Sequence, residues 1–487
     1  MRECDEVDVV VVGAGLAGLS AANRVAEGGA SVLVLEKGDD ENYMCNSRIA
    51  GGVFNLAHSD PMSGATHLRD AILGDTEGYA DPSLTQAVAG AAGEAMDWLR
   101  SEGAKFIRVQ RPNSTARWSM APPRPPIAAS HLIRSTWEGR GPDYVVRSLG
   151  RQLTKRGGRI VFRTRARKLI IDNSGCAGVL ATADKTNIEI RAKYVVIADG
   201  GFQANLDLVR RFIGPRPELF TQRNARTGMG DGLLMAEEAG AYIKDCHRFY
   251  GHLLVRESAT NDELWPYPTL DTLSTNAIVV DRSGKRFIDE GVGGIPILNA
   301  LASMDDPLCA TTVFDNAIWE KIGKLEHTPP NPLLVTHGGT VHRADSLERL
   351  AEKIGVPTTQ FVATVDDYNK AIKSGTLASL TPHRTPGRMY ATLRSSEQRM
   401  AVAPIETAPF YGVPLRPGIT YTMGGIAVDA NAQVLTPLGE PIAGLYAAGT
   451  CTAGLEGGPA SGYIGGLSKA LILGFIAARS ILAEEAS

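Results

Sequence analysis

The sequence predicts an α/β protein that combines a Rossmann-like domain, discontinuous along the chain, with an inserted α+β cap domain. Two β-branched runs, at residues 7–12 and 31–36, flank a glycine cluster and a small-residue helix. Prolines, aromatic residues and loops become frequent from about residue 242, and the strand-and-glycine pattern returns after about residue 395. We therefore expect the Rossmann-like domain at residues 1–241 and 395–487, with the cap domain at residues 242–394.

The first 36 residues predict the core of the Rossmann-like domain. Val7–Val12 is a continuous apolar run, which is typical of a strand buried on both faces. A helix is expected over Leu16–Gly28, and a second buried strand over Ser31–Glu36. A strand–helix–strand unit of about 30 residues predicts two parallel strands.

The remaining elements follow from the spacing of apolar residues. Between residues 84 and 102 apolar side chains recur at intervals of three or four, which predicts a helix. The pattern also predicts strands at residues 160–171, 188–197 and 445–448, and helices at residues 231–241, 346–353, 360–374 and 463–482.

Composition excludes several classes of function. The formal net charge is −3 and no long basic run exists, so nucleic acid is not an expected partner. The six cysteines form no CxxC or haem-attachment motif, and no metal site is predicted. The N-terminal residues lack the pattern of a signal peptide, and no apolar run approaches the roughly 20 residues of a membrane span. We expect a cytoplasmic protein without a membrane span.

The strongest motif is Gly13-Ala-Gly15-Leu-Ala-Gly18. Gly13 permits a tight turn, Gly15 lets the backbone approach a pyrophosphate, and Gly18 lets the helix pack closely on the strand. The helix N-terminus offers free N–H groups to phosphates. Glu36, at the end of the next strand, can accept hydrogen bonds from ribose hydroxyls. The motif in this context predicts dinucleotide binding.

Further segments resemble the fumarate reductase/succinate dehydrogenase flavoprotein family, which includes the 3-ketosteroid dehydrogenases. These segments lie at residues 46–52, 194–202, 227–232, 279–290, 422–425, 444–450 and 462–466, so the resemblance covers nearly the whole chain. It implies an FAD-binding domain in two parts, with the substrate bound between the flavin and the cap domain. In this family two hydrogens are moved across a carbon–carbon bond, one as a hydride through the flavin and one as a proton through a side chain.

The motif and the resemblance together assign a set of residues to FAD. The set comprises Gly13, Gly15, Leu16, Ala17, Gly18, Glu36, Lys37, Asn46, Ser47, Gly51, Gly52, Ala166, Ala198, Asp199, Gly200, Asn205, Asp231, Gly449, Thr450, Ser461, Gly465, Gly466 and Leu467. Some relatives attach FAD to a histidine in the loop that here reads Met44-Cys45-Asn46-Ser47, and this loop has none. Non-covalent FAD is therefore expected, with attachment through Cys45 as the disfavoured alternative.

The departures from the family pattern concern catalysis. Tyr463 and Tyr421 stand where fumarate reductases carry an arginine and a histidine, and Trp319 stands near their cap arginine. A substrate-contacting histidine is matched by His252. The closing segment around Tyr463 is similar to that of 4-ene ketosteroid dehydrogenases, in which a tyrosine lies in the active site. Phenol groups thus replace most of the cationic clamp for a dicarboxylate.

The types of these residues suggest catalytic roles, but they do not show which side chain removes the substrate proton. Tyr463 is expected beside the flavin, where its hydroxyl can polarise a ketone or act in proton transfer. The amides of residues 465–467 can face either the pyrimidine carbonyls of the flavin or the substrate oxygen. An ordinary tyrosine pKa is near 10, so a tyrosinate base needs a lowered pKa or a relay. Tyr421, Tyr250 and His252 are the candidates, with His252 as a relay.

Three sets of charged residues are assigned no direct role in catalysis. Glu290 ends a family-like segment without its arginine partner, and we interpret it as structural. For Arg124, His131 and Arg134 a solvated loop is favoured over a site for a substrate carboxylate. Arg163, Arg165 and Arg167 are likewise interpreted as a solvated strand face.

The predicted activity is an FAD-dependent dehydrogenase that desaturates a ketone, either a cyclic oxo acid or a ketosteroid-like molecule, to an α,β-unsaturated ketone. The alternatives are fumarate-reductase-like reduction of an activated alkene carboxylate and a flavoprotein subunit of an electron-transfer complex. The electron acceptor stays open between O2, a quinone and a carrier.

Overall fold

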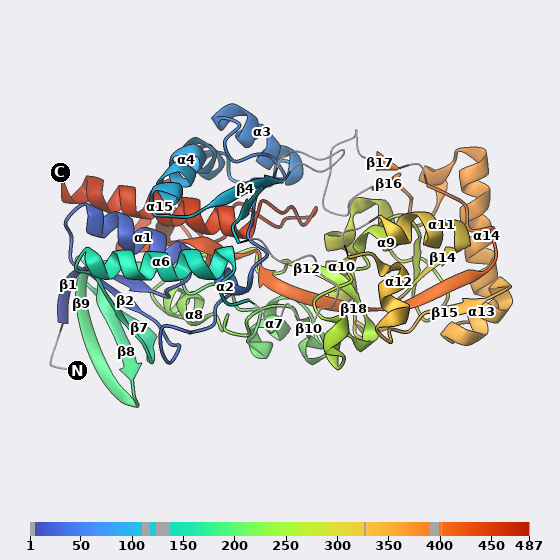
Figure 1. Ribbon diagram of the computed structural model, residues 1–487, viewed down its shortest axis with the longest axis horizontal. Coiled ribbons are helices and arrows are strands. Elements are labelled where there is room, and N and C mark those ends of the chain that lie inside the picture. The colour runs from blue at the N-terminus through green and yellow to red at the C-terminus, as the bar shows by residue number, and fades with distance from the viewer. Residues whose placement is uncertain are drawn as a thin grey trace.

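The computed structural model describes residues 5–109, 117–122, 137–325, 328–388, 399–400 and 402–486. Arg124, His131 and Arg134 lie outside these ranges. The chain forms two bodies, and both labelled chain ends lie in the same one (Figure 1). This body contains the Rossmann-like sheet, and the other contains a second sheet surrounded by helices.

The Rossmann-like sheet has the strand order β20-β21-β9-β1-β2-β6, and β7 and β8 extend it through β9. β1 pairs in parallel with both β2 and β9, which confirms the predicted parallel unit at the N-terminus. The strands are β1 Asp5–Val12, β2 Val32–Leu35, β6 Arg159–Val161, β7 Thr164–Asp172, β8 Gly175–Ala183, β9 Thr186–Ile197, β20 Gln433–Leu435 and β21 Pro441–Ala447.

The helices of this body are α1 Leu16–Glu27, α2 Asn46–Ile49, α3 Ala65–Asp75, α4 Pro82–Ser101, α6 Gly141–Lys155, α8 Asp231–Glu238 and α15 Gly466–Glu485. A further helix, α7 Leu206–Phe212, buries Leu208 and Val209 in the core of the second body. α15 packs against α1 and α4. Among the described helices only α15 is long and apolar enough to cross a membrane by composition, and 72% of its most apolar window is buried. Packing in the core accounts for this apolar composition.

The second body is built on a six-stranded sheet around β18. Its strands are β10 Thr221–Gln222, β12 Phe249–Val255, β13 Ile278–Val280, β14 Thr311–Asp315, β15 His342–Ala344 and β18 Phe410–Thr422. Its helices are α9 Asp271–Thr275, α10 Gly294–Ala302, α11 Asn316–Lys321, α12 Pro330–Thr336, α13 Leu347–Ile354 and α14 Thr358–Ser374. β10 and β18 lie outside residues 242–394, so the expected boundaries do not coincide with the edges of this sheet.

Short elements complete the chain. The small strands are β3 Val53–Phe54, β4 Phe106–Val109, β5 Arg117–Met120, β11 Ile243–Lys244, β16 Gly387–Arg388, β17 Arg399–Met400 and β19 Gly425–Ile426. The 3-10 turns are η1 Pro217–Leu219, η2 Arg256–Ala259, η3 Asp262–Leu264, η4 Glu290–Val292, η5 Ile322–Lys324, η6 Leu377–Ser379 and η8 Gly449–Cys451.

Two predicted elements were wrong in detail. The strand predicted at residues 160–171 is two strands, β6 and β7, because Arg163 adopts a left-handed turn conformation with φ of 50°. The closing helix begins at Gly466 rather than Tyr463. Gly465 has φ of 110°, which is incompatible with an α-helix, so the chain before it is a loop.

β18 connects the two bodies. This long strand spans the second sheet and ends toward the Rossmann-like body (Figure 1). Tyr421 and Thr422 lie at that end. The second sheet therefore delivers side chains directly to the boundary between the bodies.

Candidate active site

A cavity of about 990 Å³ lies between the two bodies. Small-molecule sites commonly measure roughly 300–1,000 Å³, so this cavity is at the upper end of the range. It is lined by the four predicted catalytic residues Tyr250, His252, Tyr421 and Tyr463, and by Gly13, Gly15, Leu16, Ala17, Glu36, Lys37, Asn46, Ser47, Gly51, Gly52, Ala166, Ala198, Asp199, Gly200, Asp231, Gly449, Thr450, Gly466 and Leu467.

The glycine turn before α1 is shaped by close backbone contacts. Gly13 has φ of 99°, and a Cβ there would lie 2.8 Å from the Ala198 carbonyl oxygen. A Cβ at Gly18 would lie 2.0 Å from the Gly13 carbonyl oxygen. A Cβ at Gly15 would meet only the Ser47 Oγ, at 3.5 Å, so this glycine faces open space. Gly13 and Gly18 therefore serve the fold, whereas Gly15 keeps the cavity accessible to a ligand.

Glu36 stands at the end of β2 and joins the turn to the cavity wall. Its carboxylate accepts hydrogen bonds from the amides of Ala14, at 3.0 Å, and Gly38, at 2.8 Å. Burial raises the pKa of the Glu36 carboxyl. This side chain therefore holds the turn in place as well as lining the cavity.

An ion-pair group closes one wall of the cavity. Arg165 on β7 donates to both carboxylate oxygens of Asp231, at 2.9 and 2.6 Å. The Lys37 ammonium lies 3.7 Å from the same carboxylate. The interpretation of Arg165 as part of a solvated strand face was therefore wrong, because the tertiary fold turns it toward α8.

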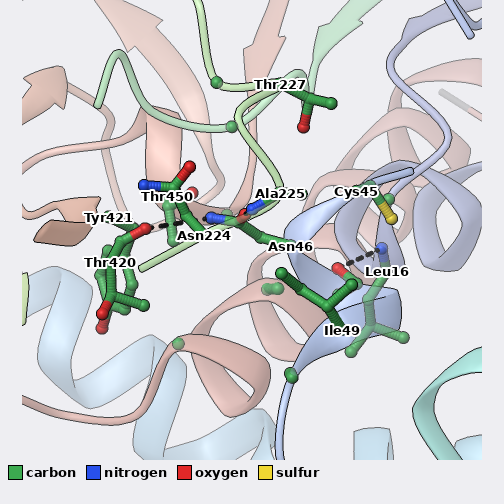
Figure 2. Close-up of a pocket in the computed structure, with 18 of the residues that line it drawn as sticks. Leu16, Cys45, Asn46, Ile49, Asn224, Ala225, Thr227, Thr420, Tyr421 and Thr450 are labelled. Atoms are coloured by element: carbon green, nitrogen blue, oxygen red, sulfur yellow. Dashed lines mark hydrogen bonds between the residues drawn. The ribbon is translucent and has the colours of Figure 1, made fainter. Parts of the chain in front are cut away.

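Asn46 joins α2 to the second body, as Figure 2 shows. Its Oδ1 accepts from the Ala225 amide at 2.9 Å, and its Nδ2 donates to the Thr420 carbonyl oxygen at 3.2 Å. The neighbouring Ser47 Oγ accepts from the Leu16 amide at 3.0 Å. The first two residues of α2 thus tie the glycine turn to β18.

Four residues assigned to the cofactor do not line the cavity: Gly18, Asn205, Ser461 and Gly465. Asn205 caps α7, since its Oδ1 accepts from the amides of residues 207 and 208. Gly465 precedes the first residue of α15, and Ser461 has φ of 50° in the loop before it. These positions shape the backbone around the cavity.

The lining residues fit a dinucleotide. The open face of Gly15 and the start of α1 offer space and amide groups to a pyrophosphate. The start of α15, at Gly466 and Leu467, presents a second helix N-terminus to the same cavity. The Asp199 carboxylate is buried and its Oδ1 has no hydrogen-bond partner in the described structure. Burial raises the pKa of Asp199 to about 6.

A Tyr–His–Asp chain lines the cavity on the side of the second body. The Tyr250 hydroxyl lies 3.1 Å from Nε2 of His252, and Nδ1 of His252 lies 3.1 Å from Oδ2 of Asp271. Burial lowers the pKa of His252, against the attraction of the Asp271 carboxylate. A neutral imidazole whose Nδ1–H donates to Asp271 leaves Nε2 as the acceptor for the Tyr250 hydroxyl.

Tyr421 belongs to a separate buried network. Its hydroxyl donates to Oε1 of Glu456 at 2.8 Å, and the Lys469 ammonium lies 3.3 Å from Oε2 of the same carboxylate. Burial and the Glu456 charge raise the pKa of Tyr421 well above its ordinary value. The phenol is therefore held in its neutral form, opposite to what a tyrosinate base requires.

Tyr463 lies in the loop before α15. Its amide donates to Oδ2 of Asp75 at 3.0 Å, which fixes the loop to the end of α3. Its ring stacks on that of Tyr250, with centroids 4.2 Å apart and planes inclined by 18°. The Tyr250 and Tyr421 ring centroids are 5.2 Å apart. The three tyrosines are thus brought together, although two come from the second sheet and one from the C-terminal loop.

The sequence interpretation missed Asp271, Glu456 and Lys469, which hold the catalytic candidates, and Arg223, which lines the cavity. Asp271, Glu456 and Lys469 are far along the chain from the side chains they contact, so no sequence pattern points to them. Arg223 lies just before the family-like segment at residues 227–232, and this proximity is the one sequence feature that could have drawn attention to it. Trp319 packs on Phe314 and does not line the cavity.

Glu290 is buried and does not line the cavity, consistent with a structural role. Its missing arginine partner is supplied elsewhere: Arg286 donates to it at 2.6 Å, and the Arg384 Nε lies 3.3 Å from it. The absence of an arginine immediately after Glu290 in the sequence is thus compensated by tertiary contacts.

Comparison with known proteins identifies the cofactor. The FAD binding domain family model matches residues 8–463. The chain is 28% identical to 4-oxocyclohexanecarboxylate 2-dehydrogenase of Sinomonas cyclohexanicum, over 98% of this chain and 93% of that protein. It is also 28% identical to NADH:fumarate oxidoreductase of Klebsiella pneumoniae, over 93% of this chain and 45% of that protein. The chain thus spans about half the length of some curated relatives it matches.

A solved structure shows the same fold. 3-ketosteroid delta1-dehydrogenase from Sterolibacterium denitrificans superposes with a TM-score of 0.74 at 19% identity, over 99% of this chain and 100% of that chain. Gly15, the two helix N-termini and Asp199 fit the cofactor that the family model names. The chain belongs to the FAD binding domain family, whose model matches residues 8–463.

Proposed function

We propose that the protein desaturates a saturated ketone to an α,β-unsaturated ketone. The observation that carries this proposal is the Tyr250–His252–Asp271 chain, which opens on the cavity. A C–H group beside a carbonyl is a weak acid, so its removal needs a base and stabilisation of the developing oxyanion. The Tyr250–His252–Asp271 chain supplies the base, and hydrogen-bond donors around the start of α15 stabilise the oxyanion.

Tyr250 is proposed as the group that receives the α-proton. As the α C–H bond breaks, its proton moves to the Tyr250 oxygen while the Tyr250 proton moves to Nε2 of His252. Asp271 stabilises the resulting imidazolium through Nδ1. This relay removes the need for a free tyrosinate, because the phenol stays neutral before and after the transfer. Of the three candidates for the base, Tyr421 is disfavoured because its proton is committed to Glu456.

Tyr463 and the start of α15 are proposed to hold the carbonyl. The hydroxyl of Tyr463 and the amides of Gly466 and Leu467 border the same cavity and can donate to the enolate oxygen. Bound FAD supplies the acceptor for the hydride that leaves the β carbon.

The direct test is anaerobic mixing of the purified FAD-loaded protein with saturated ketones, 4-oxocyclohexanecarboxylate and a 3-ketosteroid among them. Loss of the visible flavin band and formation of the enone are expected with at least one ketone. A matched alcohol without the carbonyl serves as the control and should leave the flavin oxidised. The proposal is wrong if no ketone reduces the flavin while fumarate-like acids reoxidise the chemically reduced protein.

The reverse reaction, reduction of an activated alkene carboxylate, is the second candidate. One observation favours it: the Arg223 guanidinium lines the cavity, where a carboxylate-bearing alkene needs a cation. The relatives include an NADH:fumarate oxidoreductase. Reoxidation of the reduced protein by acrylate or fumarate, faster than by an enone, would favour this direction over desaturation.

FAD is proposed to be bound without a covalent bond. Cys45 is the cavity-lining thiol near α2, and burial raises its pKa to about 12, so it stays protonated and weakly nucleophilic. Acid precipitation of the protein should therefore release all of the flavin into the supernatant. A Cys45→Ser variant should release the same fraction. Flavin that stays with the wild-type pellet and leaves the Cys45→Ser pellet would reveal a thioether.

A further inference from the structure

Among the described cations that line the cavity, Arg223 is the one whose charge is neither paired with a protein carboxylate nor exposed. The other cavity-lining cations are Lys37 and Arg165, which share Asp231, and Arg226, which is exposed. Arg223 is half-buried and directly follows β10. No carboxylate lies within ion-pair distance of its guanidinium among the described residues.

Neutral contacts hold the guanidinium in place. Its Nε donates to the Pro266 carbonyl oxygen at 3.1 Å, and its Nη1 donates to the Thr420 Oγ1 at 3.2 Å. The guanidinium carbon lies 5.0 Å from the centroid of the Tyr267 ring. These contacts fix the orientation of the group but leave its charge uncompensated, and no described side chain accepts from Nη2. An oriented, partly desolvated guanidinium is a favoured partner for a carboxylate.

The position of Arg223 relates it to the proposed catalytic chain. Arg223 pairs with β18 through its amide, which donates to the Ile419 carbonyl oxygen at 2.8 Å. On the other side of β18, Tyr250 pairs with Tyr421 and His252 pairs with Gly418. Arg223 therefore lies next to one edge of β18, and Tyr250 and His252 lie on the strand that pairs with its other edge at the same level. Trp265 and Tyr267 add an aromatic wall beside them.

We infer that the substrate is an anionic ketone, whose carboxylate is bound by Arg223 while its α carbon faces Tyr250. This inference rests on the proposed desaturation and narrows its substrate from ketones in general to oxo acids. A neutral steroid ketone offers no group to compensate the Arg223 charge, so it would leave that charge partly desolvated and unpaired.

Anion binding at Arg223 also assists the relay. The positive charge of Arg223 contributes to the lowered pKa of His252. A carboxylate bound to the guanidinium compensates that charge and raises the pKa of His252 toward its ordinary value. His252 then accepts the Tyr250 proton more readily. Substrate recognition and proton abstraction are therefore coupled through electrostatics, without any movement of the backbone.

The test compares an oxo acid with its uncharged carboxamide in the FAD-loaded wild-type protein and in Arg223→Gln. KM for 4-oxocyclohexanecarboxylate should rise roughly 30-fold or more in the variant, as expected for loss of one partner of a partly buried ion pair. KM for the carboxamide should change little. Calorimetric dissociation constants of the corresponding unsaturated acid and amide give a readout that is independent of turnover.

Two further variants make the outcomes decisive. Arg223→Lys keeps the charge but loses the planar fork, so it should recover part of the acid preference. Arg226→Gln tests the exposed arginine of the cavity: an acid-specific loss there, with none in Arg223→Gln, would overturn the assignment. Equal use of acid and amide by the wild-type protein would also overturn it, while leaving desaturation intact. If neither compound reduces the flavin but a neutral 3-ketosteroid does, the anionic substrate is overturned and desaturation stands; if no ketone reduces it, desaturation itself is wrong.

Discussion

Tyr250→Phe should lose most of its turnover with saturated ketones while keeping FAD bound. The substitution removes the hydroxyl that lies 3.1 Å from Nε2 of His252 and leaves the ring that stacks on Tyr463. Positioned acid–base groups contribute a factor of about 10² to 10⁴ to the rate, and a loss of this size is expected in kcat. Stopped-flow reduction of the flavin measures the chemical step directly.

The pH dependence gives the same relay a second signature. His252 must be neutral to accept the Tyr250 proton, and burial lowers its pKa below the ordinary value of 6.5. As the pH falls through that lowered pKa, the imidazole becomes protonated and the relay is blocked. The rate should therefore stay constant down to about pH 6.5 and decline only below it. Asp271→Asn should shift this decline to lower pH, because it removes the charge that favours the imidazolium.

Tyr411→Phe is the matched control for Tyr250→Phe. Tyr411 also lies in the second sheet, on β18, but its hydroxyl contacts Asn316 at 3.2 Å and the side chain does not line the cavity. The control should keep wild-type turnover. A Tyr250→Phe protein with unchanged flavin reduction would contradict the relay, and Tyr463 or a water molecule would then have to supply the base.

Gly15→Val should abolish tight FAD binding in a protein that still folds. Gly15 has φ of −71°, which any residue adopts, and a Cβ added there meets only Ser47 within 4 Å. The new methyl groups occupy the space where the backbone approaches the pyrophosphate. An overpacking cost of about 1–3 kcal/mol corresponds to a roughly 5- to 150-fold weaker affinity. Fluorescence titration of the apoprotein with FAD measures this change.

Two further variants, Gly18→Val and Gly93→Ala, distinguish loss of FAD contact at Gly15 from a general packing defect. A Cβ at Gly18 would lie 2.0 Å from the Gly13 carbonyl oxygen, so this variant should lose about 3 kcal/mol of apoprotein stability as well as FAD affinity. Gly93 lies within α4 with no atom near its added Cβ, so Gly93→Ala should keep the FAD affinity and raise apoprotein stability by up to about 1 kcal/mol. Urea denaturation of the three apoproteins provides the comparison. A Gly15→Val apoprotein as unstable as Gly18→Val would contradict the distinction.

The candidate site shows where local sequence information ends. The residues predicted to bind the cofactor could be found from the sequence. The glycine turn, Glu36 and the segment at residues 46–47 are short motifs, and their residues are brought together by the local course of the backbone. The start of α15 was misplaced by three residues, since the apolar pattern continues through a glycine whose positive φ stops the helix. The environment of Arg165 was predicted wrongly for a related reason. Alternation of residues along a strand shows which side chains point away from the core, but it does not show whether they meet solvent or a carboxylate on a distant helix.

The sequence by itself determined the class of this protein, through a dinucleotide turn between two buried strands and short segments that resemble a flavoprotein family. These features are local, so each is encoded within a few neighbouring residues. Only the tertiary structure decided which tyrosine hydroxyl lies beside a histidine and which donates to a carboxylate. Tyr250 meets His252 and Asp271, whereas Tyr421 meets Glu456 and Lys469, because β12, α9, β18 and the loop before α15 come together from distant parts of the chain.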